Sequence, residues 1–98
     1  MLVLALLRER DSYGYELVTR LQEAGLTDIA TGSVYPVLTR LEREGRLDSY
    51  LVQSSAGPAR KYYTPTPDGL DHLVAQRRGW QSLNDVVAVV LVPRPRSS

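Results

Sequence analysis

The stretch from residue 31 to residue 61 constrains the fold of this chain more than any other part. Its first segment has the i, i+3, i+4, i+7 spacing of a helix with one buried face, with apolar residues at Val34, Val37, Leu38 and Leu41. Gly45 then ends the helix. Two strand-favouring runs, 47–53 and 60–64, flank a turn-forming cluster at 54–59. This order of helix, stop, strand, turn and strand predicts a winged helix-turn-helix.

The residues before this stretch supply two more helices. Residues 2–10 are first apolar and then polar, which indicates a buried helix. Residues 13–24 are amphipathic, and Gly25 ends that second helix, while the short segment 26–30 allows a brief strand. Polar residues mark the expected helix starts: Asp11 or Ser12 for the second helix, and Thr31 or Ser33 for the third. The fold class is therefore mainly α with a small β-hairpin wing.

Residues 67–92 predict a fourth helix, with Thr66 as its N-cap and Pro67 at its first position. Such a helix is about 39 Å long, which exceeds what a body this small can cover. Its apolar residues follow coiled-coil spacing, interrupted once by Gln76: Leu73, Trp80, Leu83, Val87 and Val90. We therefore expect this stripe to form a homodimer. The alternative is that Trp80 and the valines fold back on their own domain.

These patterns divide the chain into three parts. Residues 1–65 form the winged helix-turn-helix domain, residues 66–92 form the dimerisation helix, and residues 93–98 form a tail of disordered composition. The whole chain has 98 residues and 43% hydrophobic residues, which suffices for one small domain. Pairing with a second copy is a common source of stability at this size.

Composition argues against an enzyme. The chain has no cysteine, and no glycine-rich phosphate loop, metal-ligand cluster or nucleophile–base pair can be assembled from its sequence. The lone histidine, His72, is expected on the surface of the fourth helix. We therefore expect no catalytic residues, no metal and no cofactor. Apolar runs are too short to span a bilayer, so we expect a cytoplasmic protein with no membrane partner.

The distribution of charge favours double-stranded DNA as the partner. Net charge is +1, but residues 33–65 carry +2 while residues 1–32 carry −2. The candidate DNA-binding residues lie on the helix 33–44 and the wing 54–61: Ser33, Tyr35, Thr39, Arg40, Arg43, Arg60 and Lys61. Each has another interpretation, since Arg40 can pair with Glu44 and wing cations can protect an edge strand. The alternative function is a winged-helix protein–protein interaction module without DNA binding.

Several segments together resemble the PadR family of bacterial transcriptional regulators. They are SYGYELVTRLQEAG, TGSVYPVLTRLEREGRL, the wing GPARKYY and the helix start TPDGLDHL. The resemblance implies a three-helix winged domain, a C-terminal dimerisation helix, and repression that a ligand relieves. Because one helix follows the wing, the chain is similar to the short branch of the family. The resemblance also implies that the Tyr35 hydroxyl contacts a DNA phosphate.

Two further expectations follow from a two-fold dimer. A two-fold protein requires a pseudo-palindromic operator. Trp80 would come close to the two-fold axis, with Gln76 and Asn84 one turn before and after it. Two indole planes with neighbouring amides could bind a small planar aromatic effector, and some PadR relatives use a similarly placed tryptophan for ligands. The alternative is that Trp80 only fills the interface.

Overall fold

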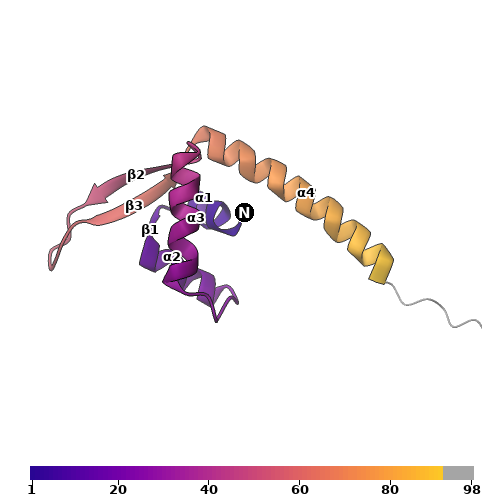
Figure 1. The fold of residues 1–98 in the computed structure, drawn as a ribbon, viewed down its shortest axis with the longest axis horizontal. Coiled ribbons are helices and arrows are strands. Elements are labelled where there is room, and N and C mark those ends of the chain that lie inside the picture. The colour runs from indigo at the N-terminus through magenta and orange to yellow at the C-terminus, as the bar shows by residue number, and fades with distance from the viewer. Residues whose placement is uncertain (92–98) are drawn as a thin grey trace, which may run out of the picture.

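The computed structural model describes residues 1–91, which form four α-helices and a three-stranded sheet (Figure 1). In chain order the elements are α1 (Leu2–Glu9), β1 (Ser12–Tyr13), α2 (Gly14–Glu23), α3 (Thr31–Arg43), β2 (Leu47–Val52), β3 (Arg60–Pro65) and α4 (Pro67–Leu91). The expected order of three helices, a hairpin and a long helix is confirmed. The expected tail, residues 93–98, lies outside the described residues, as does Val92.

The sheet has the strand order β1–β3–β2, and both pairs are antiparallel. β3 is therefore the central strand, with Tyr62 opposite Tyr13 on one side and Tyr50 on the other. Sequence patterns had pointed to a brief strand at 26–30, and that expectation is wrong, because this segment turns with a hydrogen bond from the Ile29 amide to the Leu26 carbonyl. The third strand comes instead from Ser12–Tyr13, which pairs with the edge of β3 that β2 leaves open.

A single apolar core joins the three short helices to the sheet and to the start of α4. It contains the buried faces of α1, α2 and α3, together with single residues from the later elements: Val3, Leu4, Leu7, Leu17, Val18, Leu21, Val34, Leu38, Leu41, Leu47, Tyr63 and Leu73. Strand alternation turns Tyr63 into this core and leaves Tyr62 on the outer face of the sheet. The predicted inward residues of the third helix, Val34, Leu38 and Leu41, are all buried.

Helix ends follow the sequence signals in part. Gly25 and Gly45 both have positive φ, 122° and 76°, as expected of residues that follow a helix. Thr66 caps α4, since its hydroxyl accepts a hydrogen bond from the Gly69 amide at 3.0 Å. The caps expected for α2 and α3 are wrong, because Tyr13 and Ala30 occupy those positions without a side-chain bond.

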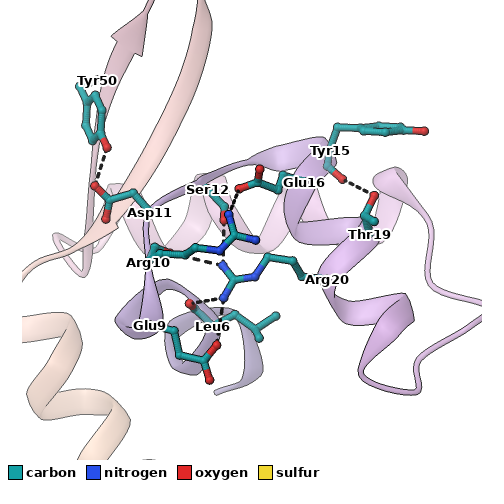
Figure 2. Close-up of polar contacts among 10 residues, drawn as sticks. All are labelled: Leu6, Glu9, Arg10, Asp11, Ser12, Tyr15, Glu16, Thr19, Arg20 and Tyr50. Carbon is teal, nitrogen blue, oxygen red and sulfur yellow. Dashed lines mark hydrogen bonds and ion pairs between the residues drawn. The ribbon is translucent and has the colours of Figure 1, made fainter.

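Buried Arg20 explains why Ser12 is not available as a cap (Figure 2). Its guanidinium donates to the Ser12 hydroxyl at 2.8 Å and to the Arg10 carbonyl at 3.3 Å. It also donates to the Leu6 carbonyl at 2.9 Å and to the Glu9 carboxylate at 3.1 Å. One side chain of α2 therefore fixes the end of α1 and the start of β1.

The other candidate cap, Asp11, has a partner in the wing. Its carboxylate accepts a hydrogen bond from the Tyr50 hydroxyl at 2.5 Å, which ties the α1–β1 connection to β2 (Figure 2). This bond raises the pKa of Tyr50 above its usual value. Both polar residues expected at the start of α2 therefore serve tertiary contacts.

α4 begins on the body and then leaves it (Figure 1). Gly69 and Leu73 are its buried residues, and a Cβ on Gly69 would lie 2.0 Å from the Arg46 carbonyl oxygen. This close approach fixes the start of the helix against the α3–β2 connection. Beyond Gln76 every described residue of α4 is exposed. Across residues 1–91, no helix combines the length and apolarity that crossing a membrane requires.

Candidate nucleic-acid interface

α3 presents a polar face to solvent because its apolar residues are turned into the core. The five expected DNA-binding residues of this helix are all exposed: Ser33, Tyr35, Thr39, Arg40 and Arg43. They do not share one flank, however. Tyr35 lies beside the start of α2 and the wing, whereas Ser33 and Arg40 line a different hollow near the N-terminus of α1. Arg40 also pairs with Glu44 at 3.5 Å, the local ion pair that the sequence allowed.

Three of the expected residues meet at a hollow of about 270 Å³ between α2, α3 and the wing. Tyr35 comes from α3, and Arg60 and Lys61 come from the first two positions of β3. The remaining lining residues are Tyr13, Gly14, Ala59 and Tyr63. A phenol and two cationic residues therefore border this hollow, and side chains of these types commonly contact phosphate groups.

Arg60 and Lys61 are neighbours in sequence but turn to opposite faces of β3. Arg60 lies on the outer face, where its guanidinium carbon is 4.6 Å from the centroid of the Tyr13 ring. The Tyr13 ring in turn contacts Tyr62 edge to face, with centroids 5.4 Å apart, and Tyr62 stacks on Tyr50 at 5.9 Å. An aromatic row across all three strands therefore supports Arg60.

Lys61 lies on the inner face and forms an ion pair with Glu42 of α3 at 3.0 Å. The other oxygen of this carboxylate accepts a hydrogen bond from Ser49 of β2. Glu42 therefore connects the exposed helix to both long strands of the wing. Hydrogen bonds from Ser49 and Lys61 lower the pKa of Glu42, and the bond to Glu42 raises the pKa of Lys61. Both groups remain charged at neutral pH.

The expected dimerisation residues divide into two groups. Leu73 is only 3% exposed and belongs to the core of its own protomer, so it is not on the surface that a second copy would meet. The other four are exposed along the projecting part of α4: Trp80 at 53%, Leu83 at 53%, Val87 at 39% and Val90 at 72%. Val86 and Leu91 extend the same exposed apolar surface.

The expected effector residues are spread along the middle of α4. Gln76 is half-buried, whereas Trp80 and Asn84 are exposed. The side-chain oxygen of Gln76 is buried and has no hydrogen-bond partner within residues 1–91. The structure brings no other described element against Trp80 or Asn84.

Four residues of this interface were not among the sequence candidates: Tyr13, Gly14, Glu42 and Ser49. A signal for Glu42 was present, because it follows Tyr35 by seven residues and so lies on the same side of the helix. Strand alternation could also have separated Lys61 from Arg60. Gly14 carried no such signal, since its role depends on how α2 and α3 pack.

The described residues contain no group of His, Cys, Asp and Glu side chains that could hold a metal ion. His72, near the base of α4, is half-buried, and desolvation by burial lowers its pKa. Neither observation adds a chemical centre to the polar surface of α3 and the wing. Within residues 1–91 that surface is the candidate site.

The sequence and the fold are both similar to those of known transcriptional regulators. The sequence matches the model of the transcriptional regulator PadR-like family over residues 3–75. The crystal structure of a PadR-like transcriptional regulator from Bacillus cereus is 36% identical, with a TM-score of 0.84 over 94% of this chain and 89% of that one. A PadR family transcription regulator from Clostridium difficile is 30% identical, with a TM-score of 0.83 over 93% and 95%. A third, from Eggerthella lenta, is 34% identical, with a TM-score of 0.82 over 95% and 83%.

Proposed function

This chain belongs to the PadR-like family of transcriptional regulators, and from that membership we propose that it is a homodimeric, ligand-responsive repressor that binds a pseudo-palindromic operator. Family membership implies regulation through DNA binding, and the members are regulators rather than enzymes. We propose three further properties that family membership does not by itself establish: the homodimer, repression as the direction of regulation, and the response to a ligand.

DNA binding centres on α3 and the wing. One observation carries this proposal: Tyr35 from α3 and the cations Arg60 and Lys61 from the wing meet at one hollow. A neutral donor and two cations suit the phosphate backbone, while the exposed Thr39 and Arg43 suit base edges in the major groove. Ser33 and Arg40, on the other flank of α3, would contact the opposite strand or the neighbouring groove edge.

The projecting part of α4 is proposed as the dimer interface. Trp80, Leu83, Val87 and Val90 supply apolar surface that their own protomer leaves exposed. A contiguous apolar surface of this kind on a small protein usually marks an interaction site. Pairing two copies through α4 would place two α3 helices on one face of a duplex, which a two-fold operator requires.

Ligand response is proposed to act through the same helices. Gln76, Trp80 and Asn84 would surround a small planar aromatic effector, with the indole ring stacking on it and the amides binding its rim. A ligand that prefers one crossing angle of the two α4 helices would change the separation of the two α3 helices and release the operator.

Repression by such a protein is tested on the DNA beside its own gene. We expect the purified protein to bind that promoter fragment as a dimer and to release it when a planar aromatic compound quenches Trp80 fluorescence. Trp80→Ala is the control for the ligand. Quenching that leaves DNA affinity unchanged would remove the effector proposal alone. A protein that binds no duplex DNA at low salt would instead be a winged-helix interaction module.

A further inference from the structure

Gly14 lies directly beneath the ring of Tyr35. It is the first residue of α2 and is buried. A Cβ built on it would lie 2.6 Å from both Cζ and Oη of Tyr35 and 2.7 Å from Cε1, which is closer than real Cβ atoms approach. The backbone of Gly14 does not have positive φ. What glycine supplies here is therefore space for the tyrosine and not an unusual backbone conformation.

The preceding residue, Tyr13, supports the other side of the same hollow. Its ring lies under the guanidinium of Arg60 at 4.6 Å, within the range of a cation–π contact. The ring is itself held in place, because Tyr13 pairs with Tyr62 across β1 and β3 and the two rings meet edge to face. Two consecutive residues thus contact one side chain from α3 and one from the wing.

We propose that Tyr13 and Gly14 are positioning residues for DNA binding, which set the places of Arg60 and Tyr35 relative to each other. This inference rests on the proposed function, in which Tyr35 and Arg60 contact phosphates. Tyr13 and Gly14 act through those two side chains. Their backbone belongs to β1 and α2. Arg20 of α2 donates to the Ser12 hydroxyl of β1 and to the Leu6 carbonyl of α1, so these elements are joined in one body (Figure 2).

The surroundings of Gly14 allow its role in positioning Tyr35 to be tested without unfolding the protein. The atoms that a methyl group on Gly14 would meet are at the far end of the Tyr35 side chain, which is 45% exposed and has room to turn outward. Gly14→Ala should therefore displace the hydroxyl while the protein stays folded. A helix also tolerates alanine better than glycine, so the melting temperature should be unchanged or slightly higher.

The test measures binding of the full chain to a mixed-sequence duplex of about 30 base pairs, which is long enough for both α3 helices of a dimer to bind one helical turn apart. Tyr35→Phe and Gly14→Ala should each weaken binding about tenfold, the worth of one hydrogen bond to a charged group. Neither should change the dependence of affinity on salt, because the lost group is neutral. Gly79→Ala is the matched control, since a Cβ at Gly79 meets nothing within 4 Å.

The double variant distinguishes positioning from a general disturbance of the fold. In a Tyr35→Ala background no ring remains to be displaced, so Gly14→Ala should have no further effect on DNA binding. A loss that persists undiminished in this background would overturn the role of Gly14, as would wild-type binding by Gly14→Ala when Tyr35→Phe is weak. If Tyr35→Phe itself binds like the wild type, the proposed phosphate contact of Tyr35 fails instead.

Tyr13 is tested through its ring. Tyr13→Phe keeps an aromatic face under Arg60 and should bind the duplex like the wild type, whereas Tyr13→Leu should weaken binding several-fold. The weakening should disappear in an Arg60→Ala background, because the supported cation is then absent. Equal binding by the phenylalanine and leucine variants would overturn the role of Tyr13.

Discussion

The winged body and the projecting part of α4 use their apolar residues in opposite ways. In residues 1–73 the large aliphatic side chains of α1, α2 and α3 gather in one core, and Arg20 and Glu42 join neighbouring elements through polar contacts. In residues 77–91 Trp80, leucine and valine side chains are exposed. The body thus buries most apolar residues of its short helices within one chain, whereas the projecting helix leaves a continuous apolar surface exposed, which on a small protein usually marks an interaction site.

The largest effect should come from placing a charge on that helix. Leu83→Glu would bury two carboxylates at the proposed two-fold interface, each at a cost of several kcal/mol. We expect a monomer that retains the circular dichroism of the folded body and loses most of its operator affinity. Sedimentation and a DNA titration measure both. A variant that stays dimeric would place the interface elsewhere.

Within the body, Leu38→Ala should destabilise the fold by about 3 kcal/mol, because Leu38 is fully buried and its truncation leaves a cavity. This loss in the free energy of unfolding should be the same at every protein concentration at which the folded protein is fully dimeric. Val87→Ala should instead weaken the proposed dimer, so its melting temperature should fall further below that of the wild type as the protein is diluted. Chemical denaturation at several concentrations distinguishes the two, and equal concentration dependence would contradict the difference between the regions.

The Arg20 network should contribute somewhat less. Arg20→Met keeps the length and apolar stem of the side chain but leaves the Ser12 hydroxyl and the Leu6 carbonyl without their donor. We expect a loss of about 2 kcal/mol in the free energy of unfolding. Arg10→Met, which removes an exposed ion pair with Glu16, is the control and should cost less than about 1 kcal/mol. Similar losses in Arg20→Met and Arg10→Met would show that the buried hydrogen bonds of Arg20 add no more stability than an exposed ion pair.

The wing cation Lys61 should have a moderate effect, seen mainly in the salt dependence. If its ammonium reaches a phosphate while paired with Glu42, Lys61→Ala should lower the slope of log K against log salt by about 1 for each protomer bound, on any sequence. An unchanged slope would mean that Lys61 serves only the ion pair with Glu42. Anisotropy titrations at several salt concentrations provide the measurement.

The smallest predicted effect is on the pH dependence of stability. The pKa of Glu42 is lowered from its usual 4.5 by hydrogen bonds from Ser49 and Lys61. The stabilisation is therefore fully present above pH 4.5 and is lost as the pH falls through the lower value of the folded state. Glu42→Gln should lower the stability at neutral pH and remove this part of the acid dependence, so that the two proteins become equally stable only below the lowered pKa of Glu42. An identical acid profile in both proteins would show that the ion pair does not stabilise the wing.

Residue patterns sufficed for the parts of the fold that depend on local sequence. The 3.6-residue period located α2 and α3, and an apolar run followed by polar residues located α1. Gly25 and Gly45 marked two helix ends, and Gly57-Pro58 marked the turn of the wing. β1 was missed because a two-residue strand has no period and exists only through the open edge of β3. The predicted caps of α2 failed for a similar reason, since Arg20 and Tyr50 bind Ser12 and Asp11 from distant parts of the sequence.

The candidate site was likewise predictable only in the features that depend on local sequence. Spacing alone brought Tyr35 and Thr39 to the exposed face of the third helix and placed the two cations on the wing. It could not show that Tyr35 and Arg60 line one hollow beside Gly14, because that arrangement is set by the packing of α2, α3 and β3. Leu73 was assigned to the dimer for the same reason, since its spacing matches the exposed stripe but its position lies over the core.

Sedimentation equilibrium of the unmodified chain at micromolar concentration tests the central claim most directly. The chain has a mass of 10.9 kDa, and the exposed apolar part of α4 predicts twice that mass, with dissociation on dilution or on introduction of Leu83→Glu. A mass of 10.9 kDa at all concentrations would contradict the account. The projecting helix would then need a partner other than a second copy, and the two-fold operator would lose its basis.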